Sequence, residues 1–574
     1  MKKYLIVGGV AGGATTAARL RRLDEKAEII LFERGQHISY ANCGLPYYIG
    51  GKIEERDKLL VQTPEDFEQR FSLEVRIENE VQNINKEEKY IEVKNLKTDQ
   101  LYQEQYDKLV LSPGARPVRP PIPGVNDSRI FTIRNVSDTD RIKEYIDQNN
   151  PQRAVIVGGG FIGLEMAENL HKSGIFSTIV EMAEQVMTPL DYEMAAEVHQ
   201  HLKVKGVEFY LSDPVMSFED SEDRELAVVL KSGKVLQSDM VVLAIGVRPE
   251  TELAEKAGLD VGEHGIKVNE YLQTSDQNIY AVGDAIEYEC PFLKKKKNTY
   301  LAGPANRQGR LCADNLVKGN KRKYEGSTDT AIAKVFDLTV ASTGLSEKTL
   351  KNENIDYIST ITHSASHAGY YPGAKPMSIK ITYAPDTGKL FGAQIIGYAG
   401  VDKRIDMLAS VLKFSGTIYD VQEIEHAYAP PFSSAKDPVN IAGYVAENVI
   451  QDVMPIVDWQ DVKNYQQEST YLLDVRTKGE YNMDHIENSV NIPVDELRNN
   501  LDKIPADKKI YVYCAAGIRG YLAVRILKQH GFDRVYNLTG GIKTYNFATQ
   551  KQSNEDIFEG DYFTKDDILY DRSS

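Results

Sequence analysis

The stretch KYLIVGGVAGGATTAARLRRL (residues 3–23) decides the fold of the N-terminal half of the chain. An apolar run of strand length ends in glycine, and a glycine loop then opens a helix that carries alanine and leucine. The segment AEIILFE (27–33) follows as a second apolar strand that ends on an acid, Glu33. Strand, glycine loop, helix, strand and acid together form a dinucleotide-binding unit, in which a diphosphate lies at the helix N-terminus.

The same pattern recurs at residues 153–181, RAVIVGGGFIGLEMAENL followed by STIVEM. Gly158, Gly160 and Gly163 satisfy GxGxxG in full, with glycines for the tight turn, for the approach of the pyrophosphate and for helix–strand packing. Glu181 is placed to accept a hydrogen bond from a ribose 2′-hydroxyl, which favours NADH over NADPH, although an acid at a solvated strand end is common. Two such units predict two bound dinucleotides.

The length, composition and charge of the chain limit the classes of protein to which it can belong. At about 150 residues per domain, 574 residues predict roughly three to four domains. A net charge of −16 argues against a general nucleic-acid binder, which needs a basic surface. No run reaches the ~18 apolar residues that span a bilayer, and the N-terminus lacks the apolar core of a signal peptide. Four scattered cysteines fit a reducing compartment, so we expect a cytoplasmic enzyme without nucleic-acid or membrane partners and without a metal site.

The first glycine loop departs from the full pattern and is identified by its context. Gly8 and Gly13 are in place, but Val10 occupies the middle position among the loop residues, which are Gly8, Gly9, Val10, Ala11, Gly12 and Gly13. KLVLSPGARP (108–117) is a strand that turns through Ser112 and Gly114, and NIYAVGDAIE (278–287) places Asp284 directly after Gly283, suited to polyol hydroxyls.

Together these segments resemble the pyridine nucleotide–disulfide oxidoreductase family over roughly residues 1–447. The resemblance implies FAD on the first unit, with Glu33 on the adenosine ribose and Asp284 on the ribityl chain. It also places Arg34, Ser112, Gly114 and Gly283 among the FAD-binding residues.

A single thiol, Cys43, lies in SYANCGLPYYIGG (39–51), just after the first unit. No second cysteine follows within the segment, so Cys43 must cycle alone, through a mixed disulfide, a persulfide or a sulfenic acid. The alternative is a buried free cysteine that packs as a small hydrophobe. Ser39 and Asn42 beside it supply the donors that a thiolate needs, which favours the redox role.

Within the family, the segments 8–22 and 39–51 are similar to those of coenzyme A–disulfide reductases. The NADH oxidases and peroxidases usually carry a histidine in the first glycine loop, and residues 8–13 contain none. Arg19 and Arg22 share a helix face at i, i+3, where they are suited to grip the phosphates of coenzyme A. Ser39 and Asn42 join them as expected substrate-binding residues. The alternative for the two arginines is a solvated basic helix face.

Two further segments, HAGYYPGAK (367–375) and HAYAPPFSSAKDP (426–438), resemble parts of the family that arrive from the second subunit. The resemblance implies that Tyr370 and Tyr428 are hydroxyl donors near the Cys43 sulfur and that Lys436 is a substrate ligand. Tyr371 is an equally acceptable ring at this place. Because this family dimerises through the 326–447 region, we expect a homodimer with shared active sites.

The C-terminal segment contains a second thiol in a distinctive loop. LLDVRTKGEYNMDHIENSVNIP resembles a rhodanese domain, with Asp474, Arg476, Glu480 and His485 at its recurrent polar positions. We interpret His485 as a turn residue with a backbone hydrogen bond, because a lone histidine is a poor metal site.

In YVYCAAGIRGYLAVRIL a strand ends at Cys514, and a helix is expected to begin after Gly520. Backbone N–H groups of the residues from Ala515 to Arg519 form an anion cradle, and Arg519 adds a fixed positive charge that favours a persulfide. Cys290 and Cys312 have no motif around them and are interpreted as structural, and the lysines 294–297 as a solvated loop.

The predicted fold is α/β throughout: two Rossmann-like domains that bind FAD and NAD, an α+β dimerisation domain and a C-terminal α/β rhodanese domain. The expected boundaries are 1–150 with 251–325 for FAD, 151–250 for NAD(P)H, 326–447 for dimerisation, 448–457 for a linker, 458–550 for the rhodanese and 551–574 for an acidic, loosely ordered tail.

The predicted function is reduction of coenzyme A disulfide, coenzyme A persulfide or polysulfide by NAD(P)H through FAD and Cys43. Cys514 would relay sulfane sulfur, and coenzyme A would be a bound substrate or sulfur carrier. Two alternatives stay open: an NADH oxidase or peroxidase with a Cys43 sulfenic acid, and a reductase whose rhodanese module serves only as a sulfur sensor or docking domain.

Overall fold

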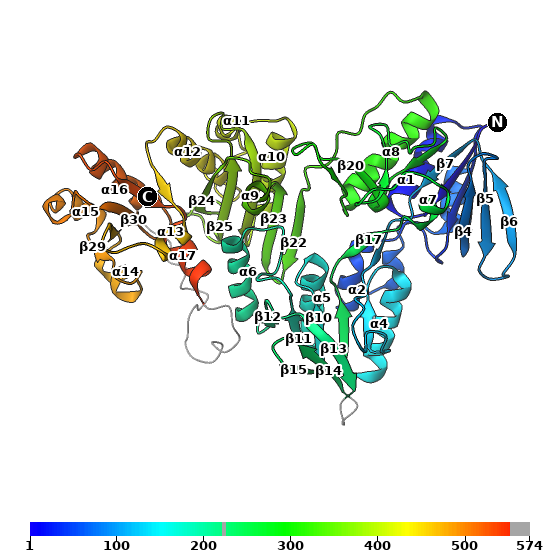
Figure 1. The fold of residues 1–574 in the computed structure, drawn as a ribbon, viewed down its shortest axis with the longest axis horizontal. Coiled ribbons are helices and arrows are strands. Elements are labelled where there is room, and N and C mark those ends of the chain that lie inside the picture. The colour runs from blue at the N-terminus through cyan, green and yellow to red at the C-terminus, as the bar shows by residue number, and fades with distance from the viewer. Residues whose placement is uncertain (221–224, 551–574) are drawn as a thin grey trace. The chain divides into compact units, whose positions relative to one another are not determined.

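A computed structural model describes residues 1–220 and 225–550, and the acidic tail expected at 551–574 lies outside the described residues. The chain divides into two compact units: Met1–Met182 with Asp213–Asp329, and Ala183–Ser212 with Thr330–Ser574 (Figure 1). In the described part of the chain, no helix combines the length and the apolarity that crossing a membrane requires.

A parallel sheet in the order β19-β7-β1-β2-β3 forms the centre of the first unit. Its strands are β1 (Lys3–Val7), β2 (Glu28–Glu33), β3 (Glu74–Ile77), β7 (Lys108–Leu111) and β19 (Ile279–Ala281). Tyr4, Leu5 and Ile6 are fully buried, as expected for a parallel strand that is covered on both faces. Helix α1 (Ala11–Leu23) packs against α8 (Ala302–Lys318).

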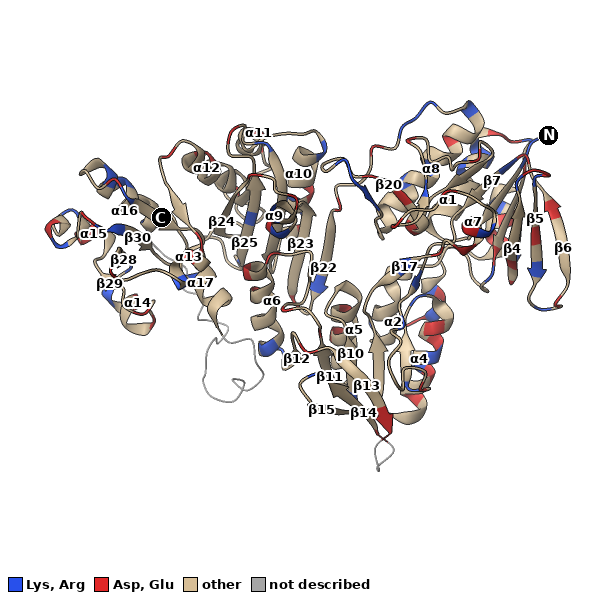
Figure 2. Cartoon of the chain, in the orientation of Figure 1, with Lys and Arg blue, Asp and Glu red and all other residues tan. Residues whose placement is uncertain are grey.

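A second parallel sheet in the same unit contains strands β11, β10, β16 and β9 in that order. Their bounds are β9 (Ile130–Thr132), β10 (Arg153–Val157), β11 (Phe176–Val180) and β16 (Met240–Leu243), with α5 (Phe161–Lys172) as the crossover helix. Helix α4 (Val136–Asn149) begins at Asn135, whose side chain accepts from the Asp138 N–H. Figure 2 shows charges of both signs along α4, and its buried side faces inward with Val136, Thr139 and Ile142.

Smaller elements complete the first unit. Antiparallel sheets join β4 (Asn79–Asn85), β5 (Tyr90–Asn95) and β6 (Leu101–Gln105), and separately β13 (Val215–Asp220), β14 (Leu226–Leu230) and β15 (Val235–Ser238). The remaining elements are α2 (Leu45–Ile49), α3 (Pro64–Phe71), β8 (Ala115–Pro117), β17 (Val247–Pro249), α7 (Glu252–Lys256), β18 (Ile266–Lys267), β20 (Ile286–Glu289) and β21 (Lys296–Lys297).

The second unit contains an antiparallel sheet in the order β22-β23-β26-β25-β24. The strands are β22 (Ala331–Val335), β23 (Leu338–Gly344), β24 (Ile358–Ala365), β25 (Pro376–Tyr383) and β26 (Leu390–Gly397). The helices around it are α6 (Tyr192–Val204), α9 (Glu347–Asn352), α10 (Val401–Lys413), α11 (Ile418–Glu423) and α12 (Pro438–Ile450).

The C-terminal part of this unit is a parallel sheet in the order β27-β31-β30-β28-β29. Its strands are β27 (Ile456–Val457), β28 (Thr470–Asp474), β29 (Val490–Asn491), β30 (Lys509–Tyr513) and β31 (Val535–Leu538). Its helices are α13 (Trp459–Lys463), α14 (Lys478–Met483), α15 (Val494–Leu497), α16 (Ile518–Gln529) and α17 (Gly541–Thr549).

The connection before this sheet is shorter than the linker expected at 448–457. Helix α12 continues to Ile450 with Ala446 fully buried on its inner side, and Ile456 already pairs with Asn537 as the first strand of the new sheet. Only residues 451–455 lie outside both elements. The apolar composition of NVI at the end of α12 belongs to the helix and not to a linker.

Direct hydrogen bonds tie the C-terminal sheet to the edge strand β24 of the antiparallel sheet. The Ile361 N–H donates to Thr539 Oγ1 at 2.8 Å, and both groups are buried. His363 Nε2 lies 2.9 Å from Thr544 Oγ1, and His363 Nδ1 lies 2.9 Å from Ser378 Oγ. Within this unit the C-terminal part is therefore docked through specific polar contacts.

Candidate active site

The first glycine loop joins β1 to α1 and has the shape that a diphosphate requires. Gly8 has φ +95°, and a Cβ there would lie 2.1 Å from the Ser112 carbonyl oxygen, so only glycine fits. Helix α1 begins after Val10 with no capping side chain and no acid in its first turn. Its N-terminal N–H groups and its dipole are therefore available to an anion, in spite of the valine at the middle position.

Glu33 lies where the sequence predicts it, at the end of β2 and against the loop. Its carboxylate accepts from the Gly9 N–H at 2.8 Å and from the Gly35 N–H at 2.8 Å. Its neighbour Arg34 is more than half exposed and pairs with Glu250 at 2.5 Å.

The second glycine loop, between β10 and α5, repeats this geometry. The Gly159 N–H donates to Glu181 Oε2 at 2.7 Å, so the predicted acid contacts the loop. A Cβ at Gly160 would meet no atom within 4 Å, which leaves the backbone open to a ligand. Helix α5 also begins without a capping side chain or an acid in its first turn. Both loops thus combine an uncapped helix N-terminus with a carboxylate that accepts from a loop N–H, and this combination fits a dinucleotide.

Asp284 lies in the turn Gly283–Ala285, immediately after β19 and on the same side of the sheet as the first loop. Burial raises the pKa of its carboxyl, and Arg134 opposes that rise. The Gly283 N–H donates to Gln308 of α8 at 2.7 Å. Ser112 donates its N–H to the Val7 carbonyl at 2.8 Å, and Gly114 has φ +81°. The predicted FAD-binding residues of the first unit therefore converge on one edge of one sheet.

Cys43 lies in a 3₁₀ turn, Asn42–Gly44, directly before helix α2. The preceding segment is tied to the first glycine loop, because the Ser39 N–H donates to the Gly9 carbonyl at 2.8 Å. Ser39 adopts φ +45°, a strained value for a residue with a side chain. The Asn42 amide, in the orientation that satisfies it, donates to the Arg134 carbonyl and accepts from its guanidinium at 2.6 Å each.

The surroundings of Cys43 contain two residues that the sequence analysis missed. Tyr47 on α2 donates its hydroxyl to Glu165 Oε1 on α5 at 3.2 Å. Although Cys43 is exposed as a residue, partial burial raises the pKa of its thiol, and the carboxylates of Glu165 and Asp284 add to this rise. Glu165 follows the GxGxxG loop by two residues, and its place on the cofactor helix was the one available signal.

The predicted coenzyme A arginines on α1 have different surroundings. Arg19 donates through Nε and Nη2 to Asp314 of α8, at 3.1 and 2.9 Å, so its charge is already paired. Arg22 is exposed. Helix α8 adds exposed Arg307 and Arg310 to the same pair of helices. The residues of α8 are about 295 positions from α1 in the chain, so the sequence did not identify them as its neighbours. The phosphate-binding role of Arg19 and Arg22 stays a prediction.

The two tyrosines expected to act as hydroxyl donors meet in the second unit. The Tyr370 and Tyr428 hydroxyls lie 3.0 Å apart, and both side chains are exposed, by 77% and 48%. Their hydrogen bond is the first cause of a raised Tyr370 pKa. Tyr371, the alternative ring, packs edge-on against His367 with ring centroids 5.7 Å apart. Lys436 is exposed, one residue before the buried Asp437.

Cys514 lies at the end of β30, buried at the base of the loop that leads into α16. Its Sγ accepts from the Gly517 N–H at 3.0 Å, the one bond of the predicted cradle that forms around the sulfur in the described residues. The N-terminus of α17 holds the base of this loop, because the Ile542 N–H donates to the Cys514 carbonyl at 2.9 Å and the Lys543 N–H to the Ala515 carbonyl at 3.2 Å.

Helix α16 begins at Ile518, before the Gly520 at which the sequence analysis placed its start. Gly517 has φ +134° and provides the turn into the helix. Gly520 is instead an interior helical residue, and a Cβ there would lie 2.1 Å from Asn537 Oδ1 on β31. Close packing of helix on strand, and not a helix start, accounts for this glycine.

The side chain of Arg519 is held by Glu480 in a two-bond pair, with both N–O distances 2.7 Å. Arg519 is the first cause that lowers the pKa of Glu480, to about 2. The expected action of Arg519 on the sulfur therefore stays a prediction. Asp474 and Arg476 form a buried pair at 2.7 Å. His485 Nδ1 lies 3.0 Å from the Tyr481 carbonyl, which confirms the predicted backbone hydrogen bond, although the turn itself is at residues 487–488.

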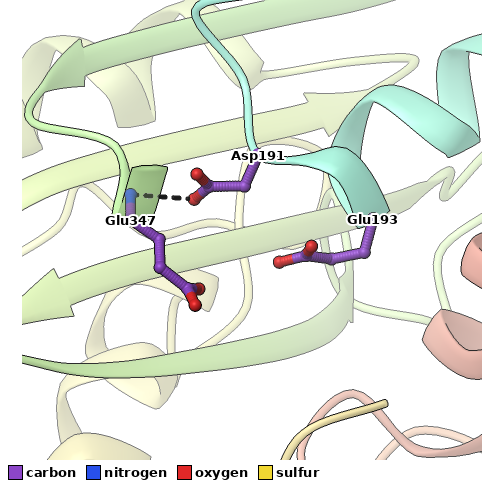
Figure 3. Close-up of side chains that lie close together, drawn as sticks. All are labelled: Asp191, Glu193 and Glu347. Atoms are coloured by element: carbon purple, nitrogen blue, oxygen red, sulfur yellow. Dashed lines mark hydrogen bonds between the residues drawn. The ribbon is translucent and has the colours of Figure 1, made fainter. Parts of the chain in front are cut away.

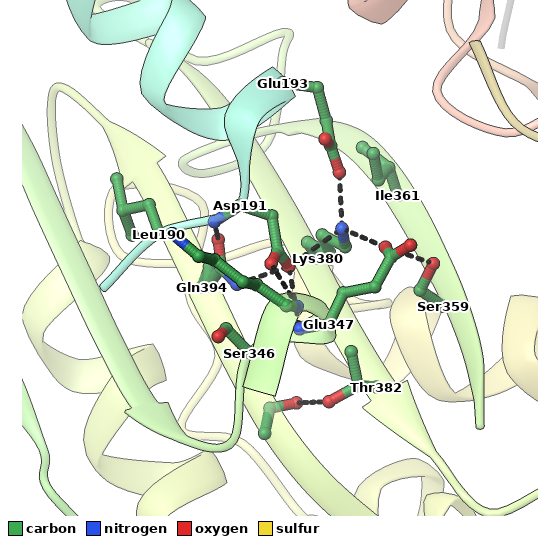
Figure 4. A network of polar contacts seen from close by, with 12 residues as sticks. Leu190, Asp191, Glu193, Ser346, Glu347, Ser359, Ile361, Lys380, Thr382 and Gln394 are labelled. Atoms are coloured by element: carbon green, nitrogen blue, oxygen red, sulfur yellow. Dashed lines mark hydrogen bonds and ion pairs between the residues drawn. The ribbon is translucent and has the colours of Figure 1, made fainter. Parts of the chain in front are cut away.

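One acidic cluster elsewhere in the second unit has the appearance of a metal site. Asp191, Glu193 and Glu347 point their carboxylates toward a common centre (Figure 3). Lys380, which is 1% exposed, occupies that centre and forms ion pairs with all three (Figure 4). The chain itself supplies the cation there, so a metal ion is not needed to balance the acids.

The remaining residues that the sequence singled out are two cysteines and a run of four lysines. Cys290 and Cys312 are buried, at 3% and 0% exposure, in agreement with a structural role. Burial raises the pKa of the Cys312 thiol. The interpretation of lysines 294–297 as a solvated loop is wrong for the last two, because Lys296–Lys297 form strand β21 and Lys297 pairs with Asp329.

Comparison with known proteins gives matches along almost the whole chain. A family model described as pyridine nucleotide-disulphide oxidoreductase matches residues 2–309, the dimerisation domain of that family matches residues 330–438, and a rhodanese-like domain matches residues 458–548. The coenzyme A disulfide reductase of Staphylococcus epidermidis is 36% identical over 448 residues, which are 78% of this chain and 100% of that protein.

Solved structures extend the similarity to the C-terminus. Reduced Bacillus anthracis CoADR-RHD has a TM-score of 0.93 at 52% identity, covering 95% of this chain and 98% of its own. The NAD-dependent persulfide reductase from A. fulgidus has a TM-score of 0.89 at 36% identity, covering 95% and 100%. The predicted fold class and family are thereby confirmed. The chain belongs to the pyridine nucleotide-disulphide oxidoreductase family and carries a rhodanese-like domain at its C-terminal end.

Proposed function

We propose that this protein is a flavoprotein that uses NADH to reduce the disulfide or persulfide of coenzyme A at Cys43 and that moves sulfane sulfur through Cys514. The observation that carries the proposal is the presence of two different thiols in one chain. Cys43 follows a dinucleotide loop without a second cysteine, and Cys514 accepts an N–H from a rhodanese-type loop. The similarity to both coenzyme A disulfide reductases and a persulfide reductase supports the same combination.

The residues at both glycine loops fit the two nucleotides. The uncapped start of α1, with Glu33 and Asp284 around it, would hold FAD, and the open Gly160 with Glu181 would hold NADH. The 2′-hydroxyl acceptor at Glu181 favours NADH, since a carboxylate repels the 2′-phosphate of NADPH. When bound, the flavin supplies the electrons that return Cys43 to its reduced form.

The chemistry assigned to the chain itself is thiol–disulfide exchange. The Cys43 thiolate attacks one sulfur of the substrate disulfide, so that a Cys43–S–S–CoA bond forms and a coenzyme A thiolate leaves. A hydroxyl of the Tyr370–Tyr428 pair gives the leaving sulfur a proton and recovers it from solvent. With a persulfide as substrate, attack on the inner sulfur releases hydrosulfide in place of the thiolate.

Cys514 performs a separate exchange. Its thiolate attacks the outer sulfur of a persulfide or polysulfide, takes that sulfur as Cys514–S–S⁻ and releases a shorter thiol. Coenzyme A thiolate then attacks the outer sulfur and leaves as coenzyme A persulfide, the substrate of Cys43. Gly517 stabilises the negative sulfur by its N–H.

We further propose a homodimer in which the 367–375 and 426–438 segments of one subunit complete the Cys43 site of the other. The match of residues 330–438 to a dimerisation domain supports this assembly. Exposed Tyr370, Tyr428 and Lys436 are then available to the partner. Small thiols and persulfides are the proposed substrates, and the cytoplasm is the proposed location because the thiols must stay reduced.

The test is anaerobic NADH consumption by the purified protein with coenzyme A persulfide, coenzyme A disulfide, polysulfide and hydrogen peroxide offered separately. We expect Cys43→Ser to lower every sulfur-dependent rate by on the order of 1,000-fold. Cys514→Ser should leave the coenzyme A disulfide rate unchanged and lower the polysulfide rate.

Two results would replace the proposal by its alternatives. Peroxide turnover faster than persulfide turnover would identify an NADH oxidase or peroxidase. A Cys514→Ser protein with unchanged rates on every sulfane substrate would make the rhodanese module a sensor or docking domain.

A further inference from the structure

A hydrogen bond links the Cys43 helix to the second nucleotide-binding helix. Tyr47 follows Cys43 by four residues, about one helical turn, so that both side chains emerge on neighbouring turns. The Tyr47 hydroxyl donates to Glu165 Oε1 at 3.2 Å, from α2 to α5. Neither residue takes part in the chemistry described above.

Among the described residues, the one charged group that acts on the Glu165 carboxyl is another acid, Glu168, which raises its pKa. On α5, Glu168 is paired with Lys172. On the side of α4, Arg56 is paired with Asp140 at 2.7 Å. Arg134 is hydrogen-bonded to Asn42, and its charge acts on Asp284, the other acid that raises the pKa of the Cys43 thiol. Cys43 therefore shares its surroundings with carboxylates, and two negative charges here oppose one another.

We propose that Glu165 is a positioning residue that, together with Tyr47, holds a proton while Cys43 is a thiolate and gives it up once the Cys43 sulfur is bonded to substrate. The inference rests on the proposed role of Cys43 as the redox thiol, and it adds the group that keeps the charge of the site constant through the cycle.

The chemical step balances in atoms and charge. Cys43–S⁻, R–S–S–R′ and Glu165–COOH become Cys43–S–S–R, R′–SH and Glu165–COO⁻. One S–S bond breaks and one forms, and the proton of Glu165 ends on the departing sulfur by way of hydroxyls and solvent. In the ionised form Tyr47 donates to Glu165, and in the protonated form Glu165 donates to Tyr47, which frees the phenol proton.

The protonation behaviour of Glu165 suits this role. Burial raises the pKa of its carboxyl to about 7, against the opposing hydrogen bond from Tyr47. A carboxyl that titrates near neutrality exchanges its proton with little cost in either direction. The Cys43 pKa is raised by burial and then by Glu165, so protonation of Glu165 favours the thiolate.

The experiment measures the pH dependence of Cys43 alkylation by iodoacetamide in the flavin-loaded protein, with the Cys43 peptide quantified by mass spectrometry. Alkylation follows the thiolate fraction and needs no substrate. We expect Glu165→Gln to lower the pH of half-maximal alkylation by about one unit, since a neighbouring negative charge is removed. Tyr47→Phe should shift it in the same direction by less, because Glu165 without its donor stays protonated to higher pH.

Two variants serve as controls. Tyr48→Phe removes the adjacent hydroxyl of α2, and Glu219→Gln removes an exposed acid of β13 that takes no part in the pair. We expect each control to move the alkylation midpoint by less than about 0.3 unit. Bound flavin absorbance reports that each variant is folded.

Coincident profiles for the wild-type and Glu165→Gln proteins would overturn the inference, as would a Tyr48→Phe shift as large as that of Tyr47→Phe. The outcome is separable from the proposed function. A shifted profile in a protein that does not reduce coenzyme A persulfide would retain the pair and reject the substrate.

Discussion

The carboxyl groups of Glu347 and Glu165 are both largely buried, but one has a buried ammonium beside it and the other has a thiol. In the second unit, Glu347 shares Lys380 with Asp191 and Glu193, and although burial alone would raise its pKa, the ammonium lowers it to about 2. In the first unit, Glu165 lies near the Cys43 thiol, and burial raises its pKa to about 7.

At both sites burial acts to raise the pKa of the carboxyl group, and the partner decides whether the net shift is upward or downward. The buried ammonium of Lys380 favours the ionised form of Glu347, and its removal would leave the carboxylates of the cluster without their cation. A carboxyl that is left to share its surroundings with a thiol has two accessible states, which is typical of reactive sites. The same residue type is therefore held as a carboxylate in one unit and is proposed to exchange a proton in the other.

The largest predicted effect comes from removing the cation. Lys380→Met leaves three carboxylates without their ammonium, so we expect a loss of about 3–5 kcal/mol in unfolding free energy. Urea unfolding at pH 7 measures this loss. The control Lys351→Met removes the exposed partner of Glu347, which lies 2.7 Å from it, and should cost at most about 1 kcal/mol. If Lys380→Met and Lys351→Met lowered the unfolding free energy equally, the buried ammonium would not have the special effect on this cluster that we assign to it.

The pH dependence of stability should have opposite signs at the two glutamates. Because the folded pKa of Glu347 is lowered, its contribution is present above its ordinary value of 4.5 and is lost as the pH falls through about 2. The folded pKa of Glu165 is raised, so its contribution is full below 4.5 and is lost as the pH rises through about 7.

We therefore expect Glu165→Gln to become more stable relative to the wild type between pH 5 and pH 8, on the order of 1–2 kcal/mol after allowance for partial solvent exposure. Denaturant midpoints at the two pH values measure this. The exposed Glu219 on β13 supplies the control, and Glu219→Gln should show no such change. A wild-type and Glu165→Gln difference that is independent of pH would contradict the assignment.

A smaller effect concerns the link from the Lys380 cluster to the C-terminal domain. Trp459 Nε1 donates to Glu193 Oε2 at 3.3 Å, and its ring lies 5.8 Å from that of Tyr192. Trp459→Phe removes the donor and should cost about 1 kcal/mol, seen as a lower midpoint of thermal unfolding. Tyr192→Phe keeps the ring contact and is the control. An unchanged midpoint in Trp459→Phe would show that the bond adds nothing to the docking.

The parts of the fold that could be predicted from the sequence are those with local signals. The two glycine loops, their acids and the Cys514 loop follow from neighbouring residues, and the structure places Glu33 and Glu181 on their loops. The resemblance implied a role near Cys43 for Tyr370 and for Tyr428, but their contact with one another was not predicted, since 58 residues separate them.

The parts that could not be predicted depend on partners far along the chain. Lys380 in MSIKITYA has the alternation of a strand whose lysine faces water, yet it is buried because α6 and α9 bring acids to it. Tyr47 and Glu165 are 118 residues apart, and the sequence around each of them contains no pattern that predicts their contact. Arg19 and Arg519 have the charge that their roles need, but their bonds to Asp314 and Glu480 arise only in three dimensions.

Removal of the C-terminal domain would also remove Thr539, the partner of the Ile361 N–H on strand β24. β24 is the last strand of its sheet, and an uncovered last strand offers its N–H and C=O groups to any passing chain. The C-terminal domain contacts this edge through Thr539, which accepts from the Ile361 N–H, and through Thr544, which lies 2.9 Å from His363 Nε2. A version that stops before Ile456 should self-associate, as light scattering would show, and a Thr539→Val version of the full chain should do so only weakly.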